Sequence, residues 1–218
     1  MKLLKLHKNY VLNQGMLDIE ESDLEIMKKA AKENDYLGMN YYQSRFIQVY
    51  DGENDIHHNG TGEKGTSRFR LKGVGERMNK EGIDRTDWDW LIHPESMFDM
   101  LVRIKQQYPQ YKAIYITENG MGYKDDFEDG IIDDTPRIDY VRRHLYYLLK
   151  AIEAGVNVKG YFIWSLMDMF SWTNGYNKRY GLFYIDYKTQ KDIQKLQLIG
   201  INTFHKQRNC FNGKRCYL

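Results

Sequence analysis

Two short apolar runs dominate the pattern of hydrophobic and polar positions. The first, Ala113 to Ile116, is rich in β-branched and aromatic side chains and ends in Thr117, Glu118 and the turn residues Asn119-Gly120. The second runs from Val158 to Trp164. Continuous apolar runs bounded by turn residues are typical of strands buried on both faces of a parallel sheet. Residues 112–120 and 158–164 are therefore predicted to be buried strands.

Amphipathic segments lie between and before these strands. Ser22-Asp-Leu-Glu25 has the form of a capping box and predicts a helix through about Glu33, with Leu24, Met27 and Ala31 on one face. A second helix starts at Pro94 and ends at Pro109, with an apolar stripe formed by Met97, Leu101, Ile104 and Tyr108. A third has Thr135 as N-cap, Pro136 in its first turn and Gly155 after its end, and its predicted buried face consists of Ile138, Val141, Leu145, Leu148, Leu149 and Ile152.

Asp35 to Tyr42 reads as a further strand, in which Asn40 and Tyr42 point to the same side. The resulting order of strand, helix, strand, helix, strand predicts a parallel sheet with helices outside it. A closed (β/α)₈ barrel needs eight strands, typically in ~250 residues. Three strands cannot close a barrel, so the isolated chain is expected to expose two unpaired edges and to be poorly stable or to self-associate.

The segment from Asp51 to Asp87 is dense in Gly, Lys, Arg and Asn and shows no sustained period. A loop of this length predicts a functional cover or a disordered segment. His57-His58 within it is interpreted as a solvated pair, because no partner ligand stands at a metal-binding spacing.

Composition narrows the function classes. The 218 residues are 42% hydrophobic and carry a formal net charge of +2, which suits a globular core and gives no broad field for nucleic acid or an anionic membrane. No apolar run reaches the length of a membrane span, and Met1-Lys2-Leu3 does not lead into a signal peptide. Cys210 and Cys216 match no metal or redox motif, so a reduced, cytoplasmic protein is expected. A nucleic-acid-binding tail, built on Lys206, Arg208, Lys214 and Arg215, is a weak alternative because no fold motif accompanies these charges.

The candidate chemistry follows the two buried strands. Glu118 stands at the carboxyl end of the first, where α/β barrels place catalytic groups, although an acidic strand end beside a turn is the structural alternative. After the second strand, Ser171, Lys178 and Tyr180 supply two hydroxyls and an ammonium on one short loop. Such a loop can surround a dianion with donors, and a solvated basic loop is the alternative.

Several dispersed motifs resemble one family in the expected order. Asp35-Tyr-Leu-Gly-Met-Asn-Tyr-Tyr42, Arg85-Thr-Asp-Trp-Asp-Trp90, Tyr115-Ile-Thr-Glu-Asn-Gly120 and residues 164–180 are similar to the carboxyl-terminal part of glycoside hydrolase family 1. The resemblance runs from about Asp18 to Lys191, and within the family it is greatest to the 6-phospho-β-galactosidases. It implies an incomplete (β/α)₈ TIM barrel, containing about strands six to eight with their helices, and hydrolysis of 6-phosphogalactosides such as lactose 6-phosphate.

Carried over by the resemblance, Glu118 matches the nucleophile and Tyr42 the hydroxyl that hydrogen-bonds it, while Asn40 lines the pocket and Trp164 forms the floor under the sugar. The family supplies the acid/base from an Asn-Glu pair on the fourth strand, and no Asn-Glu dipeptide occurs in this sequence. The isolated chain is therefore expected to be inactive. No metal or organic cofactor is expected, since two carboxylates suffice for this reaction.

Ser171, Lys178 and Tyr180 match the residues that hold the substrate's 6-phosphate. Family members that cleave unphosphorylated sugars carry a glutamate at the position of Ser171, and a carboxylate ~4 Å from a phosphate charge would repel it by ~4 kcal/mol at an effective dielectric constant near 20. Trp172 matches an indole near the C4 hydroxyl of galactose, with packing under the loop as its structural alternative. A 6-phospho-β-glucosidase fragment and a non-catalytic product of an interrupted gene remain alternatives. The expected partners are a sugar 6-phosphate and the missing amino-terminal half, with neither nucleic acid nor membrane.

The resemblance stops near Lys191, so residues 1–191 are assigned to the family and residues 192–218 to an aberrant tail. Relatives continue with Arg-Tyr-Pro-Lys and then Ser-Ala-His-Trp-Tyr-Lys. Reverse translation of Lys191 to Asn202 with a shift of two bases permits such an ending. The tail is therefore interpreted as a frameshift product in which Cys210 and Cys216 have no mechanistic role, and a naturally divergent tail is the alternative.

Overall fold

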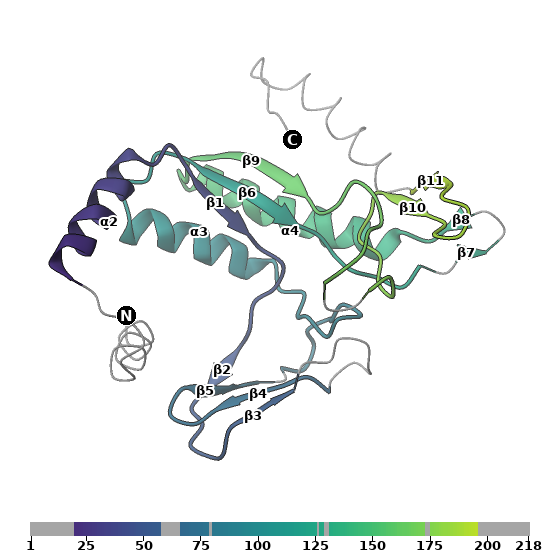
Figure 1. The fold of residues 1–218 in the computed structure, drawn as a ribbon, viewed down its shortest axis with the longest axis horizontal. Helices are drawn as coiled ribbons and strands as arrows, with labels where there is room; N and C mark the ends of the chain where they lie inside the picture. The colour runs from purple at the N-terminus through teal and green to yellow at the C-terminus, as the bar shows by residue number, and fades with distance from the viewer. Residues whose placement is uncertain are drawn as a thin grey trace.

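The computed structural model describes residues 20–57, 66–78, 80–125, 127–128, 131–172 and 175–195. Its centre is a parallel sheet of three strands in the order β1 (Leu37–Asn40), β6 (Ile114–Asn119) and β9 (Val158–Ile163) (Figure 1). These are the three strands predicted from the apolar pattern, although the first is shorter than the predicted 35–42. The chain is thus a partial α/β structure with parallel strands.

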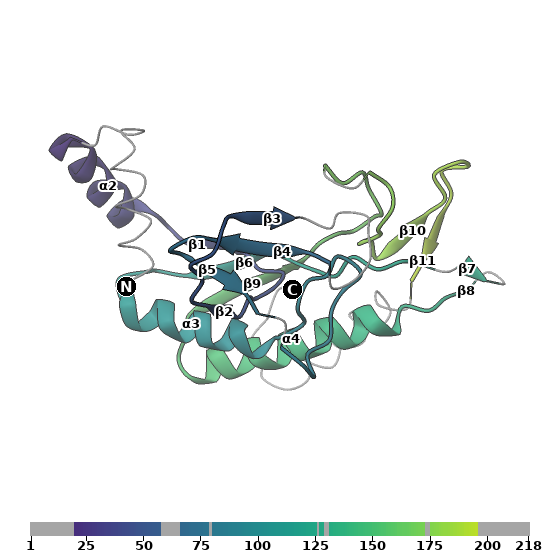
Figure 2. The ribbon, with the colours of Figure 1, turned by 90° about the horizontal axis from the view of Figure 1, so that it is seen from below.

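Two helices cover one face of this sheet, α3 (Glu95–Gln107) and α4 (Thr135–Glu153) (Figure 2). Their apolar stripes meet the sheet in one core, whose fully buried members include Met97, Leu101, Ile114, Ile116, Leu148 and Ala151. Burial of each large apolar side chain contributes roughly 1.5–3 kcal/mol relative to exposure. The helix–sheet layer therefore explains why these segments fold together and why the strand ends are held in register.

The ends of the two helices differ from the predicted ones. Thr135 is the first helical residue of α4 rather than its N-cap, which is Asp134. The Asp134 carboxylate accepts a hydrogen bond from Arg137 at 2.7 Å instead of capping the helix. Tyr108 and Ile152 were predicted on buried faces but are 50% and 40% exposed, because Tyr108 follows the last residue of α3 and Ile152 lies at the end of α4.

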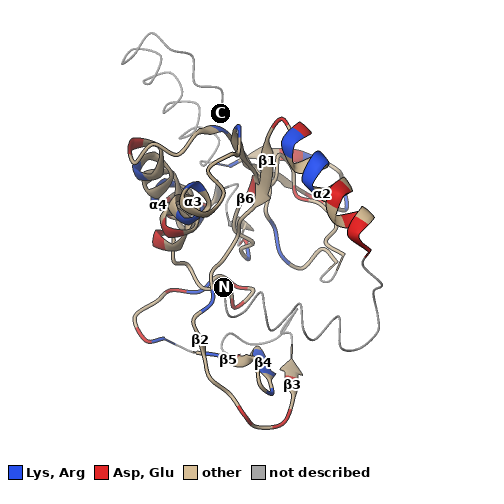
Figure 3. Ribbon diagram, turned by 90° about the vertical axis from the view of Figure 1, so that its left-hand side faces the viewer, with Lys and Arg blue, Asp and Glu red and all other residues tan. Residues whose placement is uncertain are grey.

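Helix α2 (Glu21–Glu33) contains the first predicted helix, but all of its residues are exposed. Its capping box is formed by Glu20 and Asp23, not by Ser22 and Glu25 as predicted. The face that carries Leu24, Met27 and Ala31 is not buried, and Met27 is 67% exposed. Figure 3 shows α2 standing to one side of the sheet with acidic and basic residues along its length.

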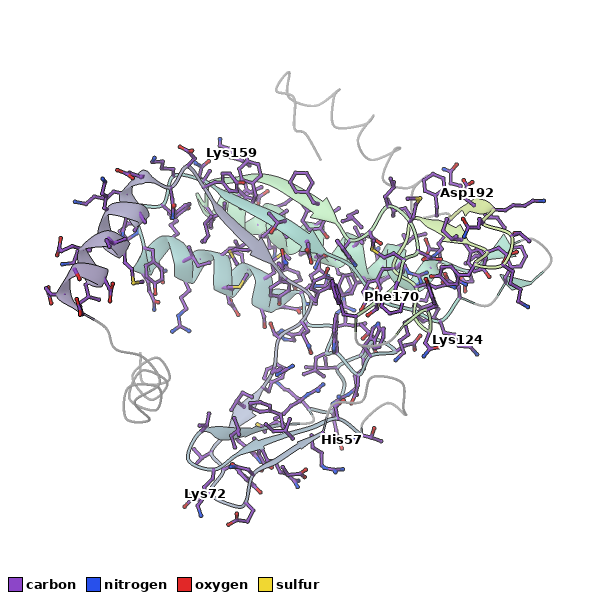
Figure 4. All side chains as sticks on the ribbon, viewed as in Figure 1. His57, Lys72, Lys124, Lys159, Phe170 and Asp192 are labelled. Atoms are coloured by element: carbon purple, nitrogen blue, oxygen red, sulfur yellow. The ribbon has the colours of Figure 1, made fainter. Side chains whose placement is uncertain are left out.

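The expectation of an irregular loop over residues 51–87 is wrong. Three strands in this range, β3 (Asp55–His57), β4 (Arg68–Leu71) and β5 (Gly75–Arg77), join β2 (Ile47–Gln48) in an antiparallel sheet of order β2-β5-β4-β3. Strands of two to four residues are too short to produce a detectable period. His57 is exposed on this sheet and Lys72 lies beyond β4 at its outer end (Figure 4), while His58 lies outside the described residues.

Two antiparallel pairs lie beyond the carboxyl ends of the central strands: β7 (Phe127–Glu128) with β8 (Ile131–Ile132), and β10 (Phe183–Ile185) with β11 (Asp192–Gln194) (Figure 1). Strand β11 belongs to the segment assigned to the aberrant tail. The rest of that tail, residues 196–218 with both cysteines and the four basic residues, lies outside the described residues, as do residues 1–19. Among the described helices, none combines the length and the apolar character needed to cross a membrane.

Candidate active site

Glu118 and Tyr42 meet at the carboxyl edge of the parallel sheet. Glu118 lies near the end of β6, and Tyr42 follows β1 by two residues. The Tyr42 hydroxyl donates a hydrogen bond to Oε2 of Glu118 at 2.7 Å. Burial, and then the neighbouring carboxylate, raise the pKa of Tyr42, so the phenol stays protonated and acts as the donor at neutral pH.

A buried amide fixes the backbone beneath this pair. Nδ2 of Asn119 donates to the carbonyl of Tyr41 at 2.6 Å and to the hydroxyl of Tyr140 at 3.1 Å. The Tyr140 hydroxyl in turn donates to the carbonyl of Tyr42 at 2.8 Å, and the Tyr161 hydroxyl donates to Oδ1 of Asn119. Because the network joins all three strands and α4, the Tyr42 backbone cannot move independently of β6.

Asn40 and Trp164 lie at the same edge. The pairing of β1 with β6 shifts register between Met39 and Asn40, which places Asn40 opposite Glu118. Such irregularities often re-aim side chains beside active sites. Oδ1 of Asn40 accepts a hydrogen bond from the Thr117 hydroxyl at 2.7 Å. Trp164 follows β9. Its backbone N–H donates to the Asn119 carbonyl at 2.8 Å, and the residue is 36% exposed.

The predicted anion-binding residues lie on the loop that follows β9, here called the phosphate loop (residues 171–180, with 173 and 174 outside the described residues). Phe170, immediately before it, lies beyond the carboxyl ends of the central strands (Figure 4). Two backbone hydrogen bonds between Ser171 and Gly175, at 2.8 and 2.9 Å, close its tip. Trp172 is 98% exposed and therefore leaves its indole faces open to solvent.

Aromatic rings connect the phosphate loop to Glu118. The Lys178 ammonium donates to the Asp87 carbonyl and lies 4.0 Å from the centre of the Trp88 ring. Tyr180 stacks on Trp88 at 6.2 Å and meets Tyr42 edge to face at 6.4 Å. The structure therefore brings Lys178 and Tyr180 into one continuous cluster with Tyr42 and Glu118, although the two groups are separated by more than fifty residues.

Sequence reasoning missed the part that Trp88 and Trp90 take in this cluster. Trp88 is 2% exposed and contacts Lys178 and Tyr180, while Trp90 meets Tyr42 edge to face at 5.5 Å. The motif Arg85 to Trp90 was noticed only as a match to relatives. The signal in the sequence was the presence of two tryptophans, Trp88 and Trp90, in an otherwise polar turn.

The matches to known proteins cover most of this chain but less than half of the length of each relative. A model of glycosyl hydrolase family 1 matches residues 4–198. The chain is 65% identical over 183 residues to a 6-phospho-beta-galactosidase of Clostridium acetobutylicum, which covers 84% of this chain and 39% of that protein. It is 57% identical over 189 residues to a 6-phospho-beta-galactosidase of Leptotrichia buccalis, covering 86% and 40%.

The fold gives the same assignment. A family 1 β-glucosidase from Thermotoga maritima superposes with a TM-score of 0.71 at 31% sequence identity, over 86% of this chain and 38% of that one. The same enzyme in complex with azafagomine superposes with a TM-score of 0.72 over 90% and 40%. The chain thus spans about two fifths of the length of the relatives it matches. With sequence and structure in agreement, the chain belongs to glycosyl hydrolase family 1.

Proposed function

We propose that this chain is the carboxyl-terminal part of a retaining 6-phospho-β-galactosidase. The observation that carries the proposal is the continuous contact from Lys178 through Trp88, Tyr180 and Tyr42 to Glu118. It gives a cation and a carboxylate in one cluster of aromatic rings, which suits a sugar that carries a dianion at one end and a scissile bond at the other. The 65% identity to a protein named 6-phospho-beta-galactosidase supports the same substrate class.

In the proposed mechanism Glu118 attacks the anomeric carbon of the galactoside and forms a covalent glycosyl-enzyme, and Tyr42 orients the attacking carboxylate. An acid about 5–5.5 Å away protonates the leaving oxygen and then, as a base, activates the water that releases the sugar. That second carboxylate belongs to the part of the barrel that this chain lacks. The chain therefore supplies the nucleophile, which is one of the two catalytic carboxylates.

The substrate is proposed to be held at both ends. Ser171, Lys178 and Tyr180 donate to the 6-phosphate, while Asn40 and Trp164 contact the sugar ring. The exposed Trp172 indole is proposed to lie against the galactose C4 side. A sugar phosphate carries charges that keep it from crossing membranes, so the reaction is proposed to take place in the cytoplasm.

The partner is proposed to be the amino-terminal part of a family 1 barrel. Strands β1 and β9 each pair with only one strand in the described part of the chain. Tyr36 and Phe162, beside and on these edge strands, are 57% and 53% exposed. Further parallel strands would satisfy the unpaired edges and bury these rings.

The test is an assay with nitrophenyl β-galactoside 6-phosphate. The chain alone should show no turnover, since no group protonates the leaving oxygen. Mixing it with the amino-terminal 60% or so of the Clostridium acetobutylicum relative should restore turnover, and the gluco epimer should react more slowly. Turnover by the chain alone would refute the proposal, and faster cleavage of the glucoside would reassign it to the gluco branch.

A further inference from the structure

Six charged side chains with almost no exposure lie at the base of the phosphate loop. This charge cluster consists of three cations and three carboxylates, namely Arg137, Arg179, Lys195, Asp125, Asp134 and Asp168. Five of the six side chains are at most 1% exposed and the sixth, Arg179, is 15% exposed. The formal charges balance. None of these residues takes part in the mechanism proposed above.

Arg137, in the first turn of α4, is the centre of the cluster. Its five N–H groups all donate, to three backbone carbonyls and two carboxylates: Met121 at 3.2 Å, Tyr123 at 3.1 Å, Arg179 at 2.6 Å, Asp125 at 2.6 Å and Asp134 at 2.7 Å. A guanidinium has five donors, so none is left over. Arg137 thereby joins the loop after β6 to the end of the phosphate loop.

Asp168 holds the phosphate loop from the other side. Its Oδ2 accepts from the Arg179 guanidinium at 2.8 Å, and its Oδ1 accepts from the Gly181 N–H at 2.8 Å. Arg137 and Asp168 thus bind the residues immediately before and after Tyr180. Since Lys178 precedes Arg179, two of the three proposed phosphate ligands are positioned by this cluster.

Lys195 links the two halves of the cluster. Its backbone N–H donates to the Leu182 carbonyl at 3.0 Å, which continues the pairing of β10 with β11. Its ammonium lies 2.6 Å from Asp125 and 3.1 Å from Asp168. Without it, three carboxylates would face two guanidinium groups, and the uncompensated negative charge would lie next to a loop that receives a dianion.

We propose that Lys195 is a positioning residue for phosphate recognition, acting through Asp125 and Asp168 on Arg179 and Gly181. This inference rests on the proposed function and adds to it how far along the sequence the functional part of the chain extends. Lys195 lies four residues inside the segment that the sequence assigns to an aberrant tail. The part of the chain needed for substrate recognition therefore extends at least through Lys195.

The experiment measures the affinity of the full chain for galactose 6-phosphate and for galactose, by tryptophan fluorescence. Lys195→Met should weaken binding of galactose 6-phosphate by about tenfold or more, while binding of galactose stays unchanged. Lys195→Arg should retain most of the affinity, and Lys191→Met, at an exposed lysine four residues before Lys195, should have no effect. Equal loss for both sugars, or no loss for either, would overturn the proposal.

Two further measurements keep the test decisive. If Lys195→Met fails to fold, it is replaced by the double variant Asp125→Asn/Lys195→Met. This double variant restores the charge balance of the cluster and should therefore fold. If it also fails to fold, the proposed role of charge is contradicted. Should the parent bind neither sugar even after mixing with the amino-terminal part of a relative, the proposed function fails, and hydrogen exchange decides this inference separately. Lys195→Met should then accelerate exchange of the Arg179 and Gly181 amides relative to those of β6, and unchanged exchange would overturn it.

Discussion

At the scale of single residues, the proposed chemistry depends on one carboxylate and the phenol that orients it. Tyr42 reaches Glu118 from the end of β1, which the amide of Asn119 ties to β6 and β9. A glutamine at position 118 would preserve the size of the side chain and an acceptor oxygen, but it would remove the nucleophile. Binding and bond cleavage can therefore be separated at this position.

We expect Glu118→Gln, in a barrel completed by the amino-terminal part of a relative, to abolish the covalent glycosyl-enzyme. Affinity for galactose 6-phosphate should stay within about twofold, because the phosphate ligands are unchanged. Intact-protein mass spectrometry after mixing with the nitrophenyl substrate detects the adduct. Glu153→Gln, at an exposed carboxylate of α4, is the matched control and should form the adduct normally.

Ser171→Glu should selectively weaken the binding of phosphorylated galactosides relative to plain galactosides. A carboxylate about 4 Å from the phosphate costs roughly 4 kcal/mol at an effective dielectric constant near 20, which is more than two decades in affinity. The ratio of kcat/KM for phosphorylated and plain galactosides reports this change. An unchanged ratio would contradict the assignment of the phosphate loop.

His144 gives a prediction about pH. It is 1% exposed, its Nδ1 lies 2.8 Å from the Tyr140 carbonyl, and burial lowers its pKa to about 4 from an ordinary value of 6.5. The unfolded chain therefore binds the proton more readily, and the stability given by the neutral imidazole is complete above pH 6.5 and is lost as the pH falls toward 4. The expected loss in unfolding free energy between pH 7.5 and pH 5 is roughly 2 kcal/mol.

Urea unfolding at several pH values, on the chain completed by the amino-terminal part of a relative, checks this expectation, with His144→Gln as the comparison. The variant should lose less stability than the parent between pH 7.5 and pH 5. If the parent and the variant change in parallel over this range, another group is responsible. An NMR titration of the imidazole gives the pKa directly.

The candidate site could be anticipated from sequence only where a residue follows a recognisable strand. Glu118, Tyr42 and Trp164 all lie at or near the carboxyl ends of predicted strands, so their meeting at one sheet edge could be inferred. Trp88 and Lys195 offered no such signal. Trp88 lies in a turn, and Lys195 acquires its role only through loops that bring Asp125 and Asp168 to it.

At the scale of elements, burial rather than helical pattern decides what contributes to the fold. Helices α2 and α3 have the same length, yet α2 has no buried residue and α3 buries Met97 and Leu101 against the sheet. The alternation of strands and helices was correct because a parallel sheet requires it. The exposure of α2 could not be predicted in this way, since an amphipathic pattern does not specify what the helix packs against.

We expect Leu101→Ala to destabilise the chain by about 2–5 kcal/mol, the usual cost of removing a fully buried leucine side chain. Ile26→Ala, at a residue of α2 that is 66% exposed, should change stability by less than about 0.5 kcal/mol. Midpoints of urea unfolding followed by circular dichroism compare the two variants, each completed by the amino-terminal part of a relative. Similar effects at both positions would mean that α2 is packed in solution.

At the scale of the whole molecule, the chain is a partial α/β structure that spans about two fifths of the length of its relatives. The three central strands leave β1 and β9 with one partner each among the described residues, and the relatives are more than twice as long. Sequence alone could show this shortage, because the number of βα units is countable. It could not show the antiparallel sheet β2-β5-β4-β3, whose strands are shorter than any period they could display.

We expect the isolated chain to self-associate at micromolar concentration and to unfold without a sharp transition. Unpaired parallel edges and exposed rings favour pairing between copies. Sedimentation velocity over a range of concentrations detects the association. Adding the amino-terminal part of a relative should convert the mixture to one species with a cooperative transition, whereas a stable, cooperative monomer of the chain alone would contradict this expectation.

The edges of β1 and β9 that pair with no strand in the described part of the chain also determine how activity would respond to dilution. When the nucleophile and the acid/base are carried by separate molecules, a catalytic centre forms only when the two molecules associate. Well below the dissociation constant of the two pieces, the number of assembled centres varies with the product of their concentrations, so diluting both tenfold would lower the rate about a hundredfold. In that range, the rate of such an enzyme would depend equally on the abundance of each piece, without any effector.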